Sequence, residues 1–372
     1  MKLIIERAAL LRSLGHVQSV VERRNTIPIL SNVRLEAGKA ALSLNATDMD
    51  IEIVETTPTD VSQPGTTTAP AHTLYDIVRK LPDGAQIEVA IDSDDAQLTL
   101  TSGRSRFALS CLPVEDFPAM AVGDYSHGFV LSAADLRTLI DRTSFAISTE
   151  ETRYYLNGIY LHAGDSDGVQ VLRAVATDGH RLARVELPLP DGAENIPGII
   201  VPRKAVTELR KLIDESQDDV SLNLSEAKIQ FSVGSVVLTS KLIDGTFPDY
   251  ERVIPLGNDK ILEADRRAFY DAVDRVSAIS AEKSRSIKLN VEKGAVTLSA
   301  SSPEAGSAVE EVEASYDAGQ LEIGFNSRYL LDILRQIEGD AARFTMADAA
   351  SPAIIRDVAD GSAVYVLMPM RV

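Results

Sequence analysis

Apolar side chains recur at helical spacing in three stretches of the chain, and each stretch begins with a short apolar strand pattern. The stretches are residues 3–17, 129–143 and 261–276, and their apolar positions are offset by 126 and 133 residues. These positions are Leu10, Leu14 and Val17, then Leu136 and Ile140, then Phe269, Val273 and Val276. Because this spacing places the side chains on one face, each stretch is predicted to be a strand followed by an amphipathic helix.

The three stretches indicate three copies of one repeated unit. A second helical pattern occurs once in each copy, at residues 70–81, 202–213 and 326–337. Its apolar positions coincide in the three copies: Leu74, Val206 and Leu330; Ile77, Leu209 and Ile333; Leu81, Ile213 and Ile337. Pro70 and Pro202 stand at the start, where proline costs little because the first N–H groups of a helix have no intrahelical partner.

Between the helices, apolar and polar residues alternate, as at residues 97–100 and 229–233. Alternation of this kind is typical of half-buried antiparallel strands. Two copies close on a Phe-Pro pair, at 117–118 and 247–248, and the third closes on residues 365–372. We therefore predict an α+β fold of three repeated domains, each with two helices packed on antiparallel sheets. The predicted domains are residues 1–125, 126–256 and 257–372.

The composition is that of a globular protein from a reducing compartment. Of the 372 residues, 45% are hydrophobic and 25% are charged, and this length requires more than one core. Cys111 is the only cysteine, which excludes an internal disulfide, and five histidines argue against a structural zinc site. The early charges Lys2, Glu6 and Arg7 do not fit a signal peptide, and no apolar run is long enough to span a membrane. We expect a cytoplasmic protein.

The net charge of −18 is distributed unevenly. Six segments chosen by apolar periodicity alone hold 19 Lys and Arg residues and 10 Asp and Glu residues, so they carry +9 and the rest of the chain carries −27. The segments are residues 7–24, 70–81, 133–149, 202–213, 265–285 and 326–337. Lysine and arginine favour helices, but glutamate does so equally and is scarce here. The distribution predicts helices that face a polyanion and an acidic surface elsewhere.

The tripeptide Ala-Thr-Asp occurs at residues 46–48 and again at 176–178. In the second copy Gly179 follows, and the flanking alternation predicts two strands joined by a tight Asp-Gly turn. Asp48 and Asp50 also suggest a metal site, but the third copy has no Asp there, and a turn-forming Asp explains the first two copies. No nucleophile motif, phosphate-cradling loop or metal-ligand cluster accompanies His180 and Arg181, so we predict no catalysis, metal or cofactor.

Longer strings identify a family. They are RYYLNG at 153–158, VATDGHRLA at 175–183, VPRK at 201–204, TSKLIDGTFPDY at 239–250, EIGFN at 322–326 and VLMPMR at 366–371. In this order over the whole chain they resemble the bacterial sliding clamp, the beta subunit of DNA polymerase III. The resemblance implies a head-to-tail homodimer that forms a closed ring, with twelve helices lining a hole for duplex DNA. At roughly 9 Å per helix, the circumference is about 110 Å and the diameter about 35 Å, which admits a hydrated duplex.

The resemblance also implies a pocket in which partner proteins dock a short peptide. Its residues are Leu156, Thr177, Gly179, His180, Arg181, Leu182, Pro248, Arg252, Val253, Asn326, Tyr329, Ser351, Val366, Leu367, Met368, Pro369, Met370 and Arg371. Methionines provide a polarizable, adaptable apolar surface, and Arg and Asn side chains can hold a peptide backbone. From the residues alone, the alternative for Met368-Pro369-Met370 is a buried C-terminal strand.

Basic helices and an aromatic pair are the expected DNA contacts. Tyr154 and Tyr155 resemble the pair with which the family meets DNA at the ring face, and aromatics beside Arg153 suit the exposed bases of a single strand. The expected DNA-binding residues are Arg24, Arg79, Arg137, Tyr154, Tyr155, Arg203, Lys204, Arg210 and Lys211. Arg24 lies in a basic turn after the first helix, and the alternative for the tyrosines is a half-buried structural pair.

Phe107 and Ile279 match apolar residues that pack across the subunit boundary in the family, with ordinary domain core as the alternative.

Three residues depart from the pattern of the family. Glu150 stands where relatives often carry a neutral polar DNA contact, Ser284 where some carry an aromatic at the pocket edge, and Ala278 where the seam has a larger apolar residue.

We therefore expect a processivity clamp without catalytic activity. It would tether the replicative DNA polymerase to duplex DNA, be opened by an ATP-driven clamp loader, and serve other replication and repair proteins through a short peptide motif. Two other classes remain open: a metal-dependent phosphodiesterase that uses Asp48, Asp178 and His180, and a peptide-binding scaffold with no role on DNA.

Overall fold

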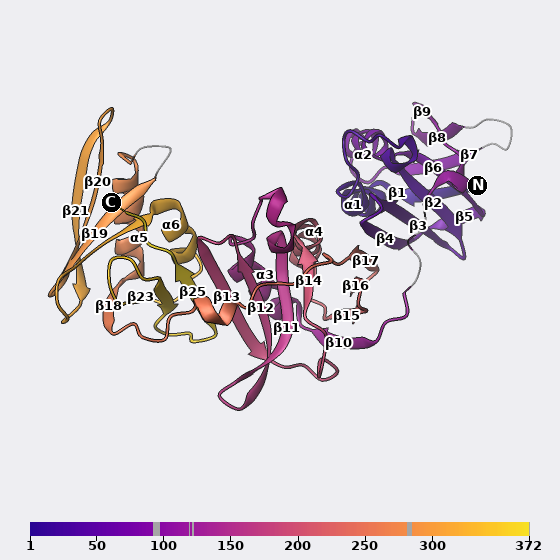
Figure 1. The fold of residues 1–372 in the computed structure, drawn as a ribbon. Helices are drawn as coiled ribbons and strands as arrows, with labels where there is room; N and C mark the ends of the chain where they lie inside the picture. The colour runs from indigo at the N-terminus through magenta and orange to yellow at the C-terminus, as the bar shows by residue number, and fades with distance from the viewer. Residues whose placement is uncertain (92–96, 119, 121–122, 281–284, 372) are drawn as a thin grey trace. The chain divides into compact units, whose positions relative to one another are not determined.

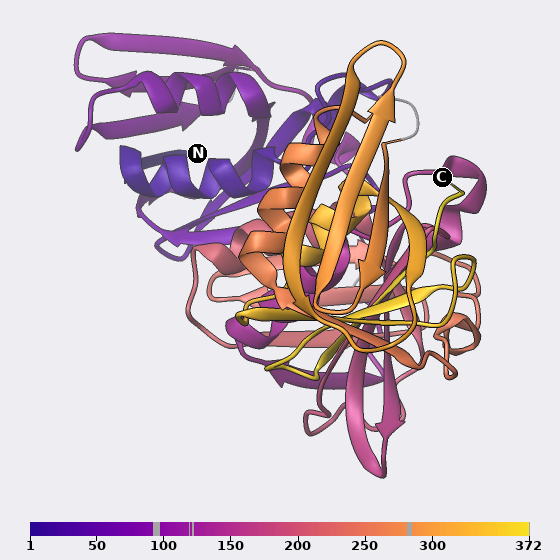
Figure 2. The same cartoon turned by 90° about the vertical axis from the view of Figure 1, so that its left-hand side faces the viewer.

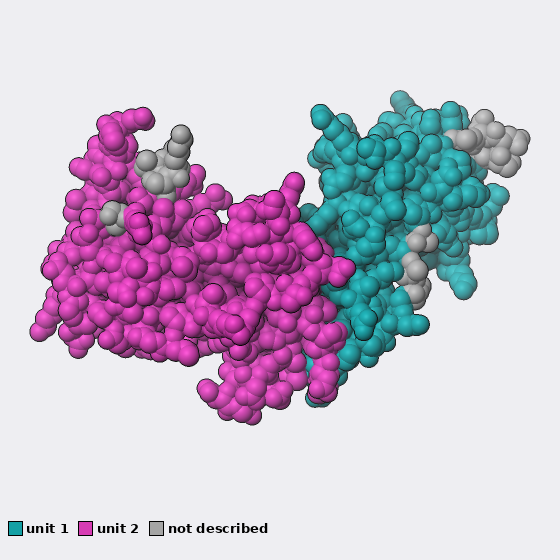
Figure 3. Space-filling model, viewed as in Figure 1, with its two compact units in different colours: residues 1–136, 190–193, 204–242 teal, residues 137–189, 194–203, 243–372 magenta. Residues whose placement is uncertain are grey.

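The computed structural model describes residues 1–91, 97–118, 120, 123–280 and 285–371, so Ser284 lies outside the described residues. Contacts divide the chain into two compact units (Figures 1 and 3). Unit 1 comprises residues 1–136, 190–193 and 204–242, and unit 2 comprises residues 137–189, 194–203 and 243–372. Within the described residues no helix combines the length and the apolar character needed to cross a membrane.

Unit 1 contains two antiparallel sheets, with strand orders β5-β1-β7-β8-β9 and β10-β15-β16-β17-β4-β3-β2-β6. Its strands are β1 (Lys2–Glu6), β2 (Asn32–Gly38), β3 (Ala41–Thr47), β4 (Ile51–Pro58), β5 (Asp60–Gln63), β6 (Gly65–Pro70), β7 (Gln86–Ile91), β8 (Gln97–Ser102), β9 (Ser105–Ser110), β10 (His127–Leu131), β15 (Val220–Leu224), β16 (Lys228–Val233) and β17 (Val236–Lys241). Its helices are α1 (Arg7–Gln18), α2 (Ala71–Lys80) and, from Lys204 on, α4 (Arg203–Asp214), with 3₁₀ turns η1 (Pro28–Ser31) and η2 (Val114–Asp116).

Unit 2 contains one twelve-stranded antiparallel sheet, with the order β14-β11-β12-β13-β25-β24-β23-β18-β21-β20-β19-β22. Its strands are β11 (Gly158–Ser166), β12 (Val169–Thr177), β13 (Arg181–Pro188), β14 (Ile199–Pro202), β18 (Lys260–Asp265), β19 (Ser286–Glu292), β20 (Ala295–Ser302), β21 (Gly306–Ser315), β22 (Leu321–Asn326), β23 (Ala341–Met346), β24 (Ala353–Asp357) and β25 (Ala363–Leu367). Its helices are α3 (Ala133–Ser144) from Arg137 on, α5 (Arg266–Ser277) and α6 (Ser327–Leu334), with 3₁₀ turns η3 (Glu151–Leu156) and η4 (Tyr250–Val253).

The predicted repeat of strand and amphipathic helix is confirmed. Helices α1, α3 and α5 each have 12 residues, and their predicted apolar faces are buried; Leu14, Val17, Phe269 and Val273 have no exposed surface. Burying an apolar side chain of this size contributes about 1.5–3 kcal/mol, so these faces dominate the stability of the helices. Figure 2 shows α1 and α2 side by side in unit 1, and α5 beside the hairpin of β20 and β21 in unit 2.

The helices are shorter than the basic segments counted from the sequence. Residues 19–24 form turns and bends after α1, and α2 ends at Lys80 because Leu81 precedes a proline and takes an extended conformation. Within the observed bounds the six α-helices hold 14 Lys and Arg residues and 8 Asp and Glu residues, a net charge of +6. The helices therefore remain positive in a chain whose net charge is −18.

The same strand pairing joins consecutive repeats. In unit 1, β17 pairs with β4, from Val236 opposite Glu55 to Ser240 opposite Ile51. In unit 2, β25 pairs with β13, from Ala363 opposite Val185 to Leu367 opposite Arg181. Shifting β4 by 130 residues and β17 by 127 residues reproduces the second register from the first. The eight-stranded sheet of unit 1 and the twelve-stranded sheet of unit 2 therefore each continue from one repeat into the next through a seam of five residue pairs in the same register.

Candidate functional site

Asp178 and Gly179 build the tight turn between β12 and β13. The Oδ1 atom of Asp178 accepts the backbone N–H groups of His180 at 2.9 Å and Arg181 at 3.0 Å. Gly179 has φ +86°, and a Cβ atom there would lie 2.6 Å from Nη1 of Arg153. The predicted strand, turn and strand are confirmed, and glycine at the second position avoids the strain that a positive φ imposes on other residues.

Arg181 fastens this turn to α6. Its guanidinium donates to Asp332 at 2.7 Å, to Asp178 at 3.1 Å and to the carbonyl oxygen of Phe145 at 2.6 Å. It also lies 4.4 Å from the ring centroid of Tyr329. Because these protein groups engage a side chain that is only 8% exposed, Arg181 positions its neighbours rather than offering free donors to a ligand.

An apolar cluster lies beside this turn and brings together three of the predicted pocket residues, Leu156, Leu182 and Val366. The cluster comprises Leu156, Val175, Leu182, Ile200, Phe247, Tyr250 and Val366, with Tyr155, Tyr160, Ile243 and Ile254 packed against it. Phe247 and Tyr250 were not among the predicted pocket residues. The sequence feature that could have indicated them is the Phe-Pro-Asp-Tyr string at 247–250.

The hydroxyl of Tyr250 connects this cluster to a buried polar network. It lies 3.0 Å from Nε2 of His162 and 3.5 Å from Nη1 of Arg173, whose Nε donates to Glu186 at 2.7 Å. Burial raises the pKa of Tyr250 and lowers the pKa of His162. Both side chains are therefore held neutral near pH 7, and the network anchors η4 to the sheet.

The residues after β25 continue as an extended segment. The N–H of Met368 donates to the carbonyl oxygen of His180 at 2.9 Å, and the N–H of Met370 donates to that of Gly324 at 2.8 Å. Met368 is 40% exposed and Met370 is half-buried, whereas β25 itself is fully buried. A buried strand therefore describes residues 363–367 but not the methionines.

Three of the predicted pocket residues use their polar groups locally. The hydroxyl of Thr177 donates to the carbonyl oxygen of Arg181 at 2.7 Å. Asn326 caps α6, because its Oδ1 accepts two N–H groups from the first turn. Ser351 donates to Asp348 at 3.0 Å in the turn before β24.

The remaining predicted pocket residues lie on the surface or in β25. Pro248, Arg252 and Arg371 are exposed, and the Arg252 side chain pairs with Asp249 at 2.6 Å. Val253 is 49% exposed at the end of η4. The ring of His180 stacks on Tyr329 with centroids 6.1 Å apart. Leu367 and Pro369 flank Met368, the former fully buried and the latter half-buried.

The predicted DNA contacts of unit 1 are basic side chains, and several of them form ion pairs with carboxylates of the same helix. Arg24 is exposed in the turn after α1. Arg79 is exposed and pairs with Asp76 at 3.1 Å, Lys211 pairs with Glu208 at 2.7 Å, and Arg210 pairs with Asp214. These pairs neutralise part of the charge of α2 and α4.

Lys204 is held by two carboxylates. Its Nζ atom lies 2.5 Å from Glu22 and 2.6 Å from Asp48, and it donates to the carbonyl oxygen of Val20 at 3.1 Å. Burial opposes the charge, but the two carboxylates outweigh it and raise the pKa of Lys204. The lysine stays charged and ties α4 to the loops of the first repeat.

The predicted DNA contacts of unit 2 are Arg137, Arg203 and the tyrosine pair. Arg137 is half-buried on α3, and Arg203 is exposed at the first position of α4. Tyr154 is 53% exposed and meets Tyr155 edge to face, with centroids 5.8 Å apart. Tyr155 is half-buried against the apolar cluster.

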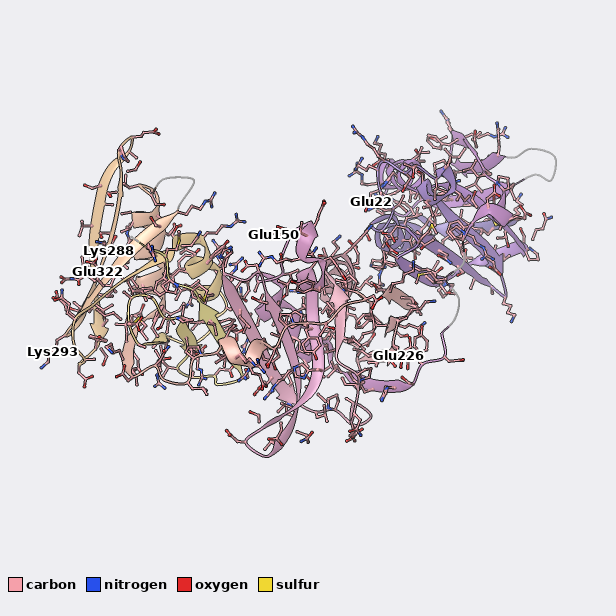
Figure 4. All side chains as sticks on the ribbon, in the orientation of Figure 1. Glu22, Glu150, Glu226, Lys288, Lys293 and Glu322 are labelled. Atoms are coloured by element: carbon pink, nitrogen blue, oxygen red, sulfur yellow. The ribbon has the colours of Figure 1, made fainter. Side chains whose placement is uncertain are left out.

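Glu150, labelled in Figure 4, precedes η3 and pairs with Arg153 at 2.7 Å. A hydrogen bond from Arg153 lowers the pKa of Glu150, so the carboxylate is charged at neutral pH. Glu150 therefore places a negative charge at the start of η3, the turn that contains the exposed Tyr154. Figure 4 also labels Lys288 on β19 and Glu322 on β22, which form an ion pair with Nζ 3.0 Å from Oε1.

Phe107 and Ile279, the predicted seam residues, are both half-buried. Phe107 lies on β9, which pairs only with β8 among the described strands. Ile279 follows α5, next to Ala278.

The aspartates of the two repeated motifs have structural partners. Asp48 Oδ1 accepts the N–H groups of Asp50 and Ile51 at 2.9 and 2.8 Å, as Asp178 does in its own turn. The second oxygen of each carboxylate binds a cation, Lys204 or Arg181. Among the residues that the structure describes, no group of three or more His, Cys, Asp and Glu side chains is arranged to hold a metal ion.

Comparisons with known proteins agree with this architecture. Family models of the DNA polymerase III beta subunit match residues 1–121 (N-terminal domain), 130–249 (central domain) and 251–371 (C-terminal domain). The beta sliding clamp of Caulobacter vibrioides is 57% identical over 372 residues, covering 100% of both chains, and that of Escherichia coli K12 is 38% identical over 374 residues, again covering 100% of both.

Solved structures give the same result. The crystal structure of the Caulobacter crescentus beta sliding clamp aligns with a TM-score of 0.98 at 57% identity, covering 100% of this chain and 99% of that one. The sliding clamp of Bartonella birtlesii bound to griselimycin aligns with a TM-score of 0.97 at 52% identity, covering 100% of both.

Repeated α+β domains joined edge to edge through their sheets define a DNA clamp. The chain belongs to the DNA polymerase III beta subunit family, the beta sliding clamps of DNA replication. As a member of this family it is a processivity subunit of the polymerase and has no catalytic activity of its own.

Proposed function

We propose that two copies of this chain assemble head to tail into a closed ring around duplex DNA and tether the replicative DNA polymerase through a docked peptide. The ring slides because phosphate contacts hold a protein on DNA without reading its sequence. An ATP-driven clamp loader opens it in the cytoplasm, and other replication and repair proteins use the same peptide site. The domain boundaries of the repeats lie at 125/126 and 256/257.

The repetition of one seam carries the proposal. β17 of the second domain pairs with β4 of the first, and β25 of the third pairs with β13 of the second. β9 of the first domain corresponds to β17 and β25, the strands that pair with the preceding domain. β21 of the third domain corresponds to β4 and β13, the strands that receive them. Pairing β9 of each copy with β21 of the other continues the series and closes it with two chains.

Burial supports this pairing. All five residues of β25 are buried at the internal seam, whereas only Leu109 is buried in β9 and only Val312 in β21. Val309 on β21 is 71% exposed. Among the described strands, the outer edge of β9 is open, and so is that of residues 306–313 in β21, because β18 pairs with β21 only at Ala314 and Ser315. Open strand edges favour pairing with another chain. The register of the internal seams, in which Leu238 faces Ile53, would place Phe107 opposite Ala308 of the partner subunit.

The peptide site would combine the apolar cluster with the exposed residues around it. Leu182 and Val366 would form its floor, and Val253, Met368 and Met370 would contact apolar anchors of the peptide. Arg371 and Asn326 would hold polar groups of the peptide. Arg181 supports the site indirectly, because its donors already hold the turn and α6.

The DNA-facing surface would be formed by the positive helices and the turns beside them. Arg24, Arg79, Arg203 and Lys211 are exposed cations that suit phosphate, while Arg137, Lys204 and Arg210 are half-buried and would add to the positive field. Tyr154 and Tyr155 would meet exposed bases at the ring face. The negative surface elsewhere would keep DNA from binding outside the ring.

The deciding experiment combines mass and topology. Light scattering at micromolar concentration should give twice the chain mass of 40.2 kDa. Rings loaded by a clamp loader should stay on nicked circular duplex and run off when the circle is cut. Equal retention on both forms would show that the binding is not topological.

One further outcome would contradict the proposed ring on DNA. A protein that binds the polymerase peptide but is never retained on circles would be a scaffold without a role on DNA.

A further inference from the structure

The first helix of every repeat carries a basic residue at its tenth position. Helices α1, α3 and α5 all have 12 residues, and the tenth residue is His16, Arg142 or Arg275. The position lies near the helix C-terminus, where a cation also interacts favourably with the helix dipole. A basic residue type at the same position in three repeats suggests that it has the same task in each.

At both internal seams this residue binds an acidic residue that follows the second helix of the next repeat. Nε2 of His16 lies 3.1 Å from Glu215, which follows α4. Nη2 of Arg142 lies 3.4 Å from Glu338, which follows α6. The backbone ladder of each seam is therefore accompanied by an ion pair between the two repeats that it joins.

Each of the three basic residues also binds another carboxylate. His16 meets Glu55 on β4 at 2.7 Å, Arg142 meets Asp360 at 2.5 Å, and Arg275 meets Glu310 on β21 at 2.5 Å. Glu310 on β21 corresponds to Glu55 on β4. Arg275 therefore makes, within its own repeat, the contact that His16 makes with Glu55. Its side chain is 60% exposed, which leaves room for a further acidic partner.

Asp83 occupies the corresponding acidic position in the first repeat. The N–H of Arg7 donates to the carbonyl oxygen of Ala85, and the N–H of Arg266 donates to that of Asp340, both at 2.8 Å. Arg7 and Arg266 begin α1 and α5, so Ala85 corresponds to Asp340, and Asp83, two residues earlier, corresponds to Glu338. Asp83 follows α2, is 95% exposed and contacts Arg7.

We infer that Arg275 of one protomer and Asp83 of the partner subunit form an ion pair at each intermolecular seam. The pair rests on the proposed head-to-tail ring, and it completes the series formed by His16 with Glu215 and Arg142 with Glu338. It lies beside the strand pairing of β9 with β21, and it differs from the internal pairs in that it forms and breaks with the ring.

A double-mutant cycle tests the pair. The dimer dissociation constants of wild type, Asp83→Asn, Arg275→Gln and the double variant should be measured by sedimentation equilibrium at low salt. Each single variant should weaken the dimer about fivefold, within the usual range for a surface ion pair, and the double variant should be no weaker than the weaker single variant. The coupling should shrink as salt rises.

Arg267→Gln is the matched control, because Arg267 is an exposed arginine of α5 outside the tenth position. It should leave the dissociation constant unchanged. If the chain dimerises but the effects of the two single variants simply multiply, the ion pair is wrong and the ring stands. If the wild type remains monomeric, both the ring and the pair are wrong.

Discussion

His16 couples pH to the stability of unit 1. The ring is 9% exposed, and Glu55 and Glu215 lie against its two nitrogens. Burial lowers the pKa of His16, but the two carboxylates outweigh burial and raise it above 6.5. A folded-state pKa above the unfolded one means that this stabilisation is complete below pH 6.5 and is lost as pH rises through the raised value.

We therefore expect the free energy of unfolding of the wild type to fall as pH rises above about 6.5, and that of His16→Gln to change less over the same range. Urea titrations at several pH values measure both slopes. Below pH 6.5 the variant should also be less stable by roughly 1–3 kcal/mol, because Glu55 loses a buried partner. Parallel pH profiles for the two proteins would contradict this role.

Met370→Ala should weaken binding of a peptide from the replicative polymerase by about 2 kcal/mol, the usual size of a hot-spot truncation. Fluorescence anisotropy with a labelled peptide measures the affinity. Val169→Ala removes a 60% exposed apolar side chain at the start of β12 and should leave the affinity unchanged. Unchanged peptide affinity in a folded Met370→Ala protein would remove this residue from the proposed site.

Single residues show clearly where sequence reasoning stops. The buried positions Leu10, Leu14 and Val17 follow from helical spacing, which is a local signal. The partners of His16 lie 39 and 199 residues away, and Asp332 lies 151 residues from Arg181. No periodicity encodes contacts of that range, so the engaged state of Arg181 and Lys204 was found only in the structure.

The edge strand β9 should control assembly. Phe107→Asp places a charge where the seam would bury an apolar side chain, so we expect the dimer to dissociate at micromolar concentration while the monomer stays folded. Sedimentation gives the mass, and circular dichroism gives the folding control. Val130→Asp is a matched variant, because Val130 is 51% exposed on β10, which is another edge strand of unit 1.

A Phe107→Asp protein that remains dimeric would contradict the pairing of β9 with β21. If Val130→Asp also dissociates the dimer, the effect would come from added charge rather than from the seam.

The elements themselves were largely predictable, and their ends and edges were not. Amphipathic spacing gave the starts of α1, α3 and α5, and Pro70 and Pro202 marked the residue before α2 and α4. The sequence could not show that β4 and β13 receive strands from the following repeats, because strand pairing between repeats leaves no local pattern. The identical registers of these seams became visible only in three dimensions.

The distribution of charge should govern the encounter with DNA. Reversing Arg24 and Arg203 to glutamate should weaken association with duplex DNA, most strongly at low salt. Each lost phosphate contact should flatten the plot of log affinity against log salt concentration by about 0.9. Electrophoretic mobility shifts over a salt series measure the slope.

The control for this charge reversal is a protein in which Lys39 and Lys293 are changed to glutamate. Lys39 and Lys293 are exposed in turns between strands, and the net charge changes by the same amount. If both double variants lose affinity equally, net charge alone explains the effect, and the proposed DNA-facing surface is wrong.

The open edges of β9 and β21 make the backbone itself a reporter of assembly. Amide hydrogens in β4 and β13 are held in sheet ladders within every single chain, so their exchange with deuterated water should be slow with or without a partner. Outward-facing amides of β9 and of residues 306–313 in β21 would find an acceptor only when a second copy docks. Their exchange should slow as protein concentration rises, and the residual rate in the closed ring would measure how often a seam opens.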